Sequence, residues 1–156
     1  MNKLIKAIHD ILTQRKLTIA TAESCTGGLL SFMLTSVPGS SKYFKLGLTV
    51  YSNTSKQRLL KIPAAIINKQ GAVSGETAKR MAQSVKKIAK TDIGVGITGI
   101  AGPGGGTIQK PAGTVYIAVV RDNKIICSKF LFKGTRAKIK EQSALKALEL
   151  IKKQNK

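Results

Sequence analysis

The chain has 156 residues, 42% of them hydrophobic and 4% aromatic, and a formal net charge of +20. This length predicts a single domain over residues 1–156 with a core of its own, and the composition excludes a disordered tail. No apolar run approaches the roughly 18 residues that indicate a membrane span, so we expect no membrane partner. The charged N-terminus is not typical of a signal peptide, and two cysteines indicate a reducing, cytoplasmic setting.

The alternation of strands and helices predicts the fold class. In chain order, the apolar spacing predicts a helix at 2–15, a strand at 17–22, a helix at 27–37 and a strand at 44–52. Three helices follow: one at 53–61, a short one that ends at residue 70, and one from 74 to 89. The rest of the chain is predicted to form strands at 92–103, 114–121 and 124–132 and a helix at 136–152. This order, with one hairpin at Asp122-Asn123, predicts a single-domain, three-layer α/β/α sandwich with a mixed sheet.

The net charge of +20 has two interpretations. Such a charge is typical of proteins that bind nucleic acid. However, the basic residues are spread along the whole chain, and few aromatic side chains are present for base stacking. Drift in amino-acid composition therefore explains the charge better than a nucleic-acid partner. An anionic small molecule would be attracted in either case, and a homo-oligomer stays open.

Three polar or glycine-rich stretches follow predicted strands: AESCTGG, VYSNTSK and TGIAGPGGG. Ligands of open α/β sheets bind beyond the carboxyl ends of the strands, so we expect these stretches to form one site. The glycines at 94, 96 and 99 match a dinucleotide fingerprint. Because they lie within a predicted strand and no helix follows, we do not interpret them as a cofactor site.

The reactive side chains present in the sequence limit the catalytic mechanisms that are possible. The single histidine, His9, is expected on the surface of the first helix, which argues against a Ser-His-Asp triad or a Cys-His pair. Two distant cysteines and few acids do not support a metal site, and we expect no cofactor. What remains is a nucleophile with lysine or tyrosine as its base.

Ser24 and Lys56 are the candidates for this pair. Ser24 lies between a strand and a helix whose first turn contains Gly27 and Gly28, where free N–H groups could bind an oxyanion or a phosphate. Lys56 falls in the first turn of the helix at 53–61, and it can act as a base only if its pKa is lowered. The alternative is that Ser24 caps a helix and Lys56 is a solvated lysine.

Five stretches resemble one known family: TAESCTGGLL, GLTVYSNTSKQRLL, GAVSGETAKRMA, GITGIAGPGGGTIQKPAGTVYIAV and FKGTRAKIKEQSA. Together they resemble the CinA C-terminal domain family, also called PncC, over nearly the whole chain. The resemblance implies a stand-alone, metal-free Ser/Lys amidohydrolase that hydrolyses the carboxamide of nicotinamide mononucleotide (NMN) in pyridine-nucleotide salvage. The products would be nicotinate mononucleotide and ammonia, and no pyrophosphatase activity is expected. A catalytically silent nucleotide-binding domain is the alternative.

The resemblance also implies roles for individual residues. It implies Ser24 as the nucleophile, Lys56 as the base, and Tyr51 as an aid to proton transfer or to positioning. Substrate binding is implied for Thr26, Gly27, Gly28, Thr98 and Gly99, and phosphate binding for Arg136.

The chain departs from the family pattern at two positions. Thr135 stands where many relatives have aspartate, and Lys140 stands where they have a second arginine. Cys25 adjoins the proposed nucleophile and is expected to pack in the core, as is Cys127 within its strand.

Overall fold

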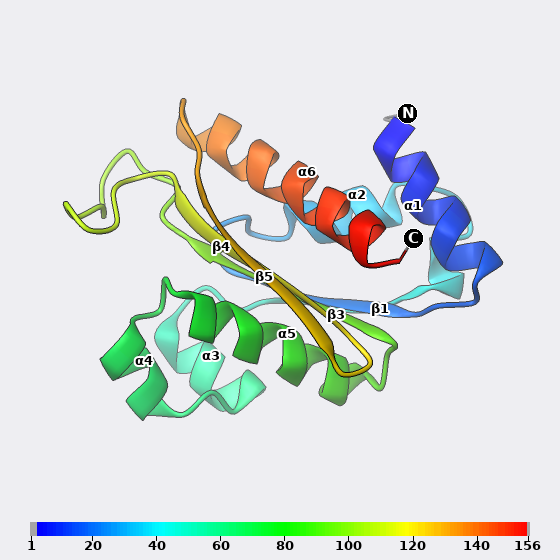
Figure 1. Cartoon of the computed structure of the whole chain (residues 1–156), viewed down its shortest axis with the longest axis horizontal. Helices are drawn as coiled ribbons and strands as arrows, with labels where there is room; N and C mark the ends of the chain where they lie inside the picture. The colour runs from blue at the N-terminus through cyan, green and yellow to red at the C-terminus, as the bar shows by residue number, and fades with distance from the viewer. Residues whose placement is uncertain (1–2, 156) are drawn as a thin grey trace.

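A computed structural model describes residues 3–155, which form one domain around a five-stranded mixed sheet (Figure 1). The strands are β1 (Ile19–Glu23), β2 (Phe44–Thr49), β3 (Ile93–Gly99), β4 (Thr114–Arg121) and β5 (Lys124–Leu131). Their order in the sheet is β2-β1-β3-β4-β5. β2, β1 and β3 are parallel, whereas β4 is antiparallel to both of its neighbours.

Helices cover both faces of the sheet, which confirms the predicted three-layer sandwich (Figure 1). One face carries α1 (Lys3–Gln14), α2 (Leu29–Thr35) and α6 (Arg136–Gln154). The other carries α3 (Asn53–Leu60), α4 (Ala64–Gln70) and α5 (Gly75–Ala89), and a short 3-10 turn, η1 (Ser40–Lys42), precedes β2. Among residues 3–155, no helix is both long enough and apolar enough to cross a membrane.

The central strands β1 and β3 are buried almost throughout, because helices cover both of their faces. On the α6 side, Leu30 and Leu148 belong to the core that contains Ile97 of β3. On the α5 side, Met81 and Val85 form a second core. Burial on both faces explains why these strands consist of nearly continuous apolar or small residues.

Two glycines of β3 allow α5 to pack directly on the backbone of the strand. A Cβ atom on Gly94 would collide with the carbonyl oxygen of Ala82, and one on Gly96 with that of Ala78. Only glycine permits such an approach. Residues 100–113 form a loop and not a helix, so the glycine spacing reflects packing and not a dinucleotide site.

The predicted elements are present, and the differences lie at their ends. The helix expected at 27–37 begins only at Leu29, because Gly27 and Gly28 have φ angles of 63° and 97°, outside the helical region. The strand expected at 92–103 is shorter, since the chain turns into the glycine-rich loop after its last glycine. The other elements agree with the prediction to within a few residues at each end.

Two side chains lie in surroundings that differ from the prediction. His9 is partly buried, and its Nδ1 lies 3.4 Å from the Tyr43 hydroxyl. Cys127 is exposed, so the expectation that it is buried is wrong. The cause is that β5 is an edge strand, where the Cys127 Sγ lies 3.6 Å from the carbonyl oxygen of Gly75 at the start of α5. The predicted start of the first helix, residue 2, lies outside the described residues.

Candidate active site

The stretches that follow β1, β2 and β3 meet at one edge of the sheet, as the sequence predicts. These strands are parallel, so their carboxyl ends share that edge. α6 begins shortly after β5, and its first residue reaches the same place. A pocket of about 200 Å³ lies there. Its lining includes Ser24, Cys25, Tyr51, Lys56, Thr98, Gly99 and Arg136.

Ser24 and Lys56 are in direct contact in this pocket. The Lys56 Nζ lies 3.0 Å from the Ser24 Oγ, 3.0 Å from the Val50 carbonyl oxygen and 3.2 Å from the Tyr51 carbonyl oxygen. A neutral amine has two N–H groups for the two carbonyls and one lone pair for the hydroxyl proton of Ser24. The contacts therefore suit a lysine that acts as the base of a serine nucleophile.

The start of α3 holds Lys56 in place. Ser52 caps this helix, since its Oγ accepts a hydrogen bond from the Ser55 N–H at 3.0 Å. Lys56 is only 2% exposed, and it forms no ion pair with a described carboxylate. Its burial lowers the pKa of the Lys56 amine below its ordinary value of 10.5, because a charge is disfavoured away from water. At a given pH, more of Lys56 is therefore neutral than of an exposed lysine.

The neighbouring thiol of Cys25 lines the same pocket in an unreactive form. Cys25 is 5% exposed and belongs to the core on the α6 side, as expected. Its burial raises the pKa of the Cys25 thiol to about 12. The thiol is therefore protonated at neutral pH, whereas the thiolate is the nucleophilic form. The lysine amine contacts the hydroxyl of Ser24 and not this sulfur.

The N–H groups available to an oxyanion in the turn between β1 and α2 are not those of Gly27 and Gly28, which the sequence predicted. The N–H of Gly27 is bonded within the turn, and that of Gly28 donates to the Glu23 Oε2 at 3.1 Å. The expectation that these two groups are free is therefore wrong. The N–H groups of Cys25 and Thr26 donate to no oxygen atom of residues 3–155. They follow the serine directly, so they are the donors that an oxyanion could use.

Tyr51 and Arg136 form a polar contact beside the pair. The Arg136 Nη2 donates to the Tyr51 hydroxyl at 2.9 Å, and its Nη1 donates to the Gly102 carbonyl oxygen at 2.8 Å. The Tyr51 side chain is 60% exposed. Its hydroxyl is therefore bonded to the guanidinium group, and the part of Tyr51 that contacts the lysine is the backbone carbonyl.

Three further residues were predicted to bind substrate: Thr98, Gly99 and Thr26. Thr98 lines the pocket, but its Oγ1 donates to the Ala72 carbonyl oxygen at 2.7 Å and so holds a wall segment. Gly99 also lines it, and a Cβ there would lie 2.7 Å from the Val115 Cγ2, so no larger residue fits. The Thr26 side chain is buried, and its Oγ1 has no hydrogen-bond partner among the described residues.

Comparison with known proteins places the chain in a family. The profile of the CinA C-terminal domain matches residues 1–155. The chain belongs to the CinA C-terminal domain family. The CinA-like protein of Syntrophus aciditrophicus is 46% identical over 147 residues, which cover 94% of this chain and 35% of that protein. The chain thus spans about a third of the length of the curated relatives it matches.

Solved structures of the CinA superfamily have the same fold. The competence-damaged protein (CinA) superfamily protein from Enterobacter cloacae is 36% identical, with a TM-score of 0.92 over 97% of this chain and 90% of that one. The competence/damage inducible protein CihA from Agrobacterium tumefaciens is 32% identical, with a TM-score of 0.94 over 100% of this chain and 98% of that one. The described residues therefore have the fold of this superfamily.

Two lysines of the CinA domain border the site in ways that the sequence did not reveal. Lys110, in the glycine-rich loop, donates to the carbonyl oxygens of Val73 at 2.6 Å and Gln70 at 3.1 Å, which fixes the pocket wall. The Lys140 Nζ lies 3.4 Å from the place where a Cβ of Gly27 would stand. Its ammonium group therefore lies against the turn that follows Ser24. Both contacts join segments distant in sequence, and no local pattern predicts them.

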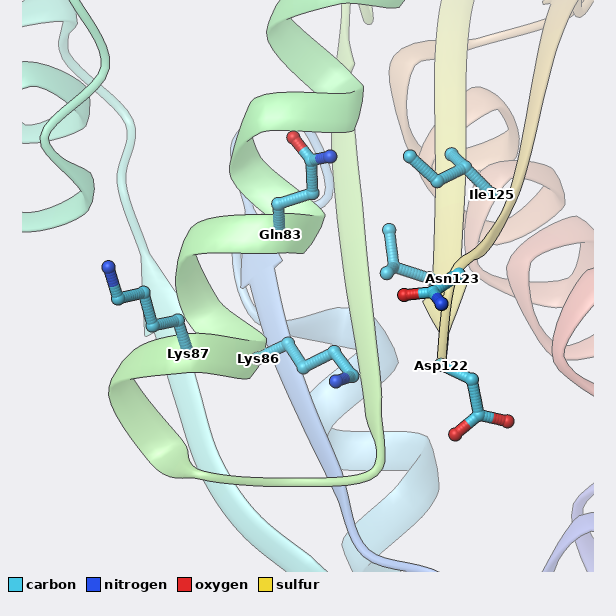
Figure 2. A pocket seen from close by; sticks show the side chains of 7 residues that line it. Gln83, Lys86, Lys87, Asp122, Asn123 and Ile125 are labelled. Carbon is cyan, nitrogen blue, oxygen red and sulfur yellow. The ribbon is translucent and has the colours of Figure 1, made fainter.

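The CinA domain has a larger hollow, of about 440 Å³, between α5 and the turn that joins β4 and β5 (Figure 2). It lies at the opposite end of the sheet, because Arg121 at the end of β4 pairs with Ile93 at the start of β3. Figure 2 shows Lys86 extending toward the turn, whereas Lys87 points away from it. The residues that line this hollow include no serine, threonine or cysteine. The smaller pocket contains the contact between Ser24 and Lys56, and it is therefore the candidate active site. The described residues bring together no group of three His, Cys, Asp or Glu side chains that could bind a metal ion.

Proposed function

We propose that this CinA-family chain is an amidohydrolase that converts NMN to nicotinate mononucleotide and ammonia. The observation that carries the proposal is the 3.0 Å contact between the Lys56 Nζ and the Ser24 Oγ inside a pocket. The resemblance of the surrounding motifs to NMN amidohydrolases supplies the substrate, and membership of the CinA family supports it. The reaction would serve pyridine-nucleotide salvage in the cytoplasm.

In the proposed reaction, the neutral amine of Lys56 accepts the hydroxyl proton of Ser24 while the Oγ attacks the carboxamide carbon. The oxyanion that forms accepts hydrogen bonds from the N–H groups of Cys25 and Thr26. The Lys56 ammonium then gives its proton to the leaving nitrogen, which departs as ammonia and leaves an ester on Ser24. Lys56 then deprotonates a water molecule, which attacks the ester carbon. The Lys56 ammonium returns this proton to the departing Ser24 Oγ, so that nicotinate mononucleotide is released and the pair is restored.

The substrate phosphate is assigned to the start of α6. A hollow of about 360 Å³ adjoins the pocket and shares Ala101 and Arg136 with it. Its lining includes Lys133 and Thr135, the N-cap residue of this 19-residue helix. Two cationic side chains and a helix N-terminus together favour a bound phosphate. The carboxamide would then lie at Ser24 while the phosphate lies in the adjoining hollow.

Ammonia release from NMN by the purified chain tests the proposed function. We expect continuous release of one ammonia per nicotinate mononucleotide formed, measured by a coupled glutamate dehydrogenase assay and by chromatography of the nucleotides. The silent nucleotide-binding domain is the alternative. Binding of NMN in calorimetry with no ammonia, at any pH between neutral and mildly alkaline, would establish that alternative and end the proposal.

Arg136→Ala is expected to raise KM for NMN by roughly 10-fold to 100-fold, because a hydrogen bond to a charged group contributes about 1.5–3 kcal/mol. Hydrolysis of nicotinamide riboside, which lacks the phosphate, is expected to change far less. The measurement is kcat and KM on both substrates. Lys138→Ala, an exposed lysine on the same turn of α6, is the matched control. Equal losses on both substrates would mean that Arg136 acts only through its contacts with Tyr51 and Gly102.

A further inference from the structure

A buried carboxylate that the proposed reaction does not use lies directly behind the serine. Glu23 ends β1 and is 0% exposed. Its Oε1 accepts hydrogen bonds from the Ser31 N–H at 2.8 Å and the Ser31 Oγ at 2.7 Å. Its Oε2 accepts from the N–H groups of Gly28 and Leu30, both at 3.1 Å. Three of these donors are backbone N–H groups, so the side-chain oxygens of Glu23 act as hydrogen-bond acceptors at the start of α2.

These contacts close the turn that carries the serine. The turn leaves β1 at Glu23 and enters α2 at Leu29, and the Glu23 side chain binds the first residues of that helix. The N-cap residue of α2, Gly28, has no side chain to cap the helix, and the carboxylate takes over this function. The Glu23 side chain therefore links the two ends of the turn in which Ser24 lies, in addition to the backbone hydrogen bonds of Ser24 and Gly27.

The backbone of the same residue supports the lysine. The Glu23 carbonyl oxygen accepts a hydrogen bond from the Val50 N–H at 2.8 Å. The Val50 carbonyl oxygen in turn accepts from the Lys56 Nζ at 3.0 Å. Glu23 is thus connected to both members of the pair, to Ser24 as its chain neighbour and to Lys56 through a single residue.

We propose that Glu23 is the positioning residue of the Ser24–Lys56 pair, an inference that rests on the proposed amidohydrolase function. Its side chain holds the turn so that the Ser24 Oγ stays within hydrogen-bond distance of the Lys56 Nζ. It also keeps the N–H groups of Cys25 and Thr26 in positions where they donate to no oxygen atom of the described residues. By filling the N-terminus of α2, the carboxylate also excludes an anionic ligand there. The substrate phosphate is consequently left to the start of α6.

Glu23→Gln tests this role, because the amide nitrogen that replaces one oxygen faces N–H donors and cannot accept from them. We expect kcat for NMN to fall by about 10-fold to 100-fold, since small misplacements of reacting groups have effects of this size. KM is expected to change by less than about threefold, because the phosphate contacts lie elsewhere. The pH at which kcat reaches half its maximum is expected to stay unchanged. All rates are measured well below the melting temperature of the variant.

Asp92→Asn is the matched control. The Asp92 Oδ2 also accepts from a backbone N–H and a hydroxyl, both of Thr18 at 2.7 Å, but at the far end of β3. We expect this variant to lose stability and keep kcat. If Glu23→Gln likewise loses only melting temperature while kcat per folded molecule is unchanged, the positioning role is overturned. Should Glu23→Gln not fold, Ser31→Ala removes one donor to the carboxylate, and a fall of kcat of a few-fold with constant KM is expected. An unchanged kcat in Ser31→Ala would then count against the proposal.

The labelling of Ser24 by an aryl sulfonyl fluoride, followed by intact mass, separates this inference from the proposed function. If the wild-type chain releases no ammonia but its serine reacts with the reagent, the substrate is wrong, and a slower labelling of Glu23→Gln than of Asp92→Asn still supports the positioning role. Equal labelling rates would contradict it. A wild-type chain that neither releases ammonia nor is labelled would overturn both proposals.

Discussion

Ser24→Ala is expected to abolish ammonia release from NMN, with a fall in kcat of at least about 10³-fold, because alanine has no oxygen to form the ester intermediate. The affinity for NMN, measured by calorimetry, is expected to stay within about threefold, since the phosphate contacts at Arg136 and the start of α6 are untouched. The fold should also be retained. The Lys56 Nζ still donates to the carbonyl oxygens of Val50 and Tyr51 when the hydroxyl is removed.

Cys25→Ala is the control for this variant, because Cys25 is adjacent and lines the same pocket. Its thiol is held in the protonated form by a pKa of about 12, so the loss of the sulfur should lower the melting temperature modestly and leave most of the activity. An inactive but folded Cys25→Ala together with an active Ser24→Ala would identify the thiol as the nucleophile. The mechanism would then need a base that contacts Cys25.

The convergence of Ser24 and Lys56 could be predicted because it follows from local rules. Parallel strands bring their carboxyl ends to one edge, so residues that follow β1 and β2 must lie near each other. Elimination of histidine, metal ligands and paired acids then left a nucleophile with lysine or tyrosine as its base, and Ser24 and Lys56 were the candidates. The helix predicted at 53–61 placed Lys56 in its first turn, close to the end of the preceding strand. Each step depends on short stretches of sequence.

The partners of the N–H groups and side chains could not be predicted, because they depend on contacts between distant segments. The N–H of Gly28 donates to the side chain of Glu23, and nothing in the sequence distinguishes this glutamate as its partner. The Tyr51 hydroxyl bonds to Arg136, which lies 85 positions away. The exposure of Cys127 follows from the position of β5 at the edge of the sheet. The pattern of apolar residues along a strand does not predict the position of that strand in the order of the sheet.

The wild-type kcat is expected to rise with pH through a single ionisation below 10.5, the ordinary pKa of a lysine. The sign follows from the burial of Lys56. Burial favours the neutral amine and so lowers its pKa, and the neutral amine is the form that accepts the serine proton. Activity should therefore be low below this lowered pKa and constant above it. The measurement is kcat for NMN across neutral and alkaline pH, within the range where circular dichroism shows an intact fold.

A chemically restored amine tests the same ionisation. In a background without the two native thiols, Cys25→Ala with Cys127→Ala, Lys56→Cys is the single cysteine, and treatment with bromoethylamine gives it an amine of nearly the length of lysine. The sulfur makes this amine less basic than lysine. We expect part of the activity to return, with its pH midpoint shifted to lower pH relative to the wild type. Recovery with an unchanged midpoint would show that another group controls the pH profile.

Lys56→Arg is expected to be as inactive as Lys56→Ala, with kcat lowered by about 10²-fold to 10⁴-fold, the usual contribution of a general base. Arginine keeps the positive charge but is not deprotonated at any working pH, so it cannot accept the proton of Ser24. If Lys56 served only as a cation that attracts the substrate, arginine would replace it. Circular dichroism and melting temperatures of both variants check that the fold is intact. Substantial activity in Lys56→Arg would overturn the Ser/Lys mechanism and leave Tyr51, whose hydroxyl is bonded to Arg136, as the next candidate base.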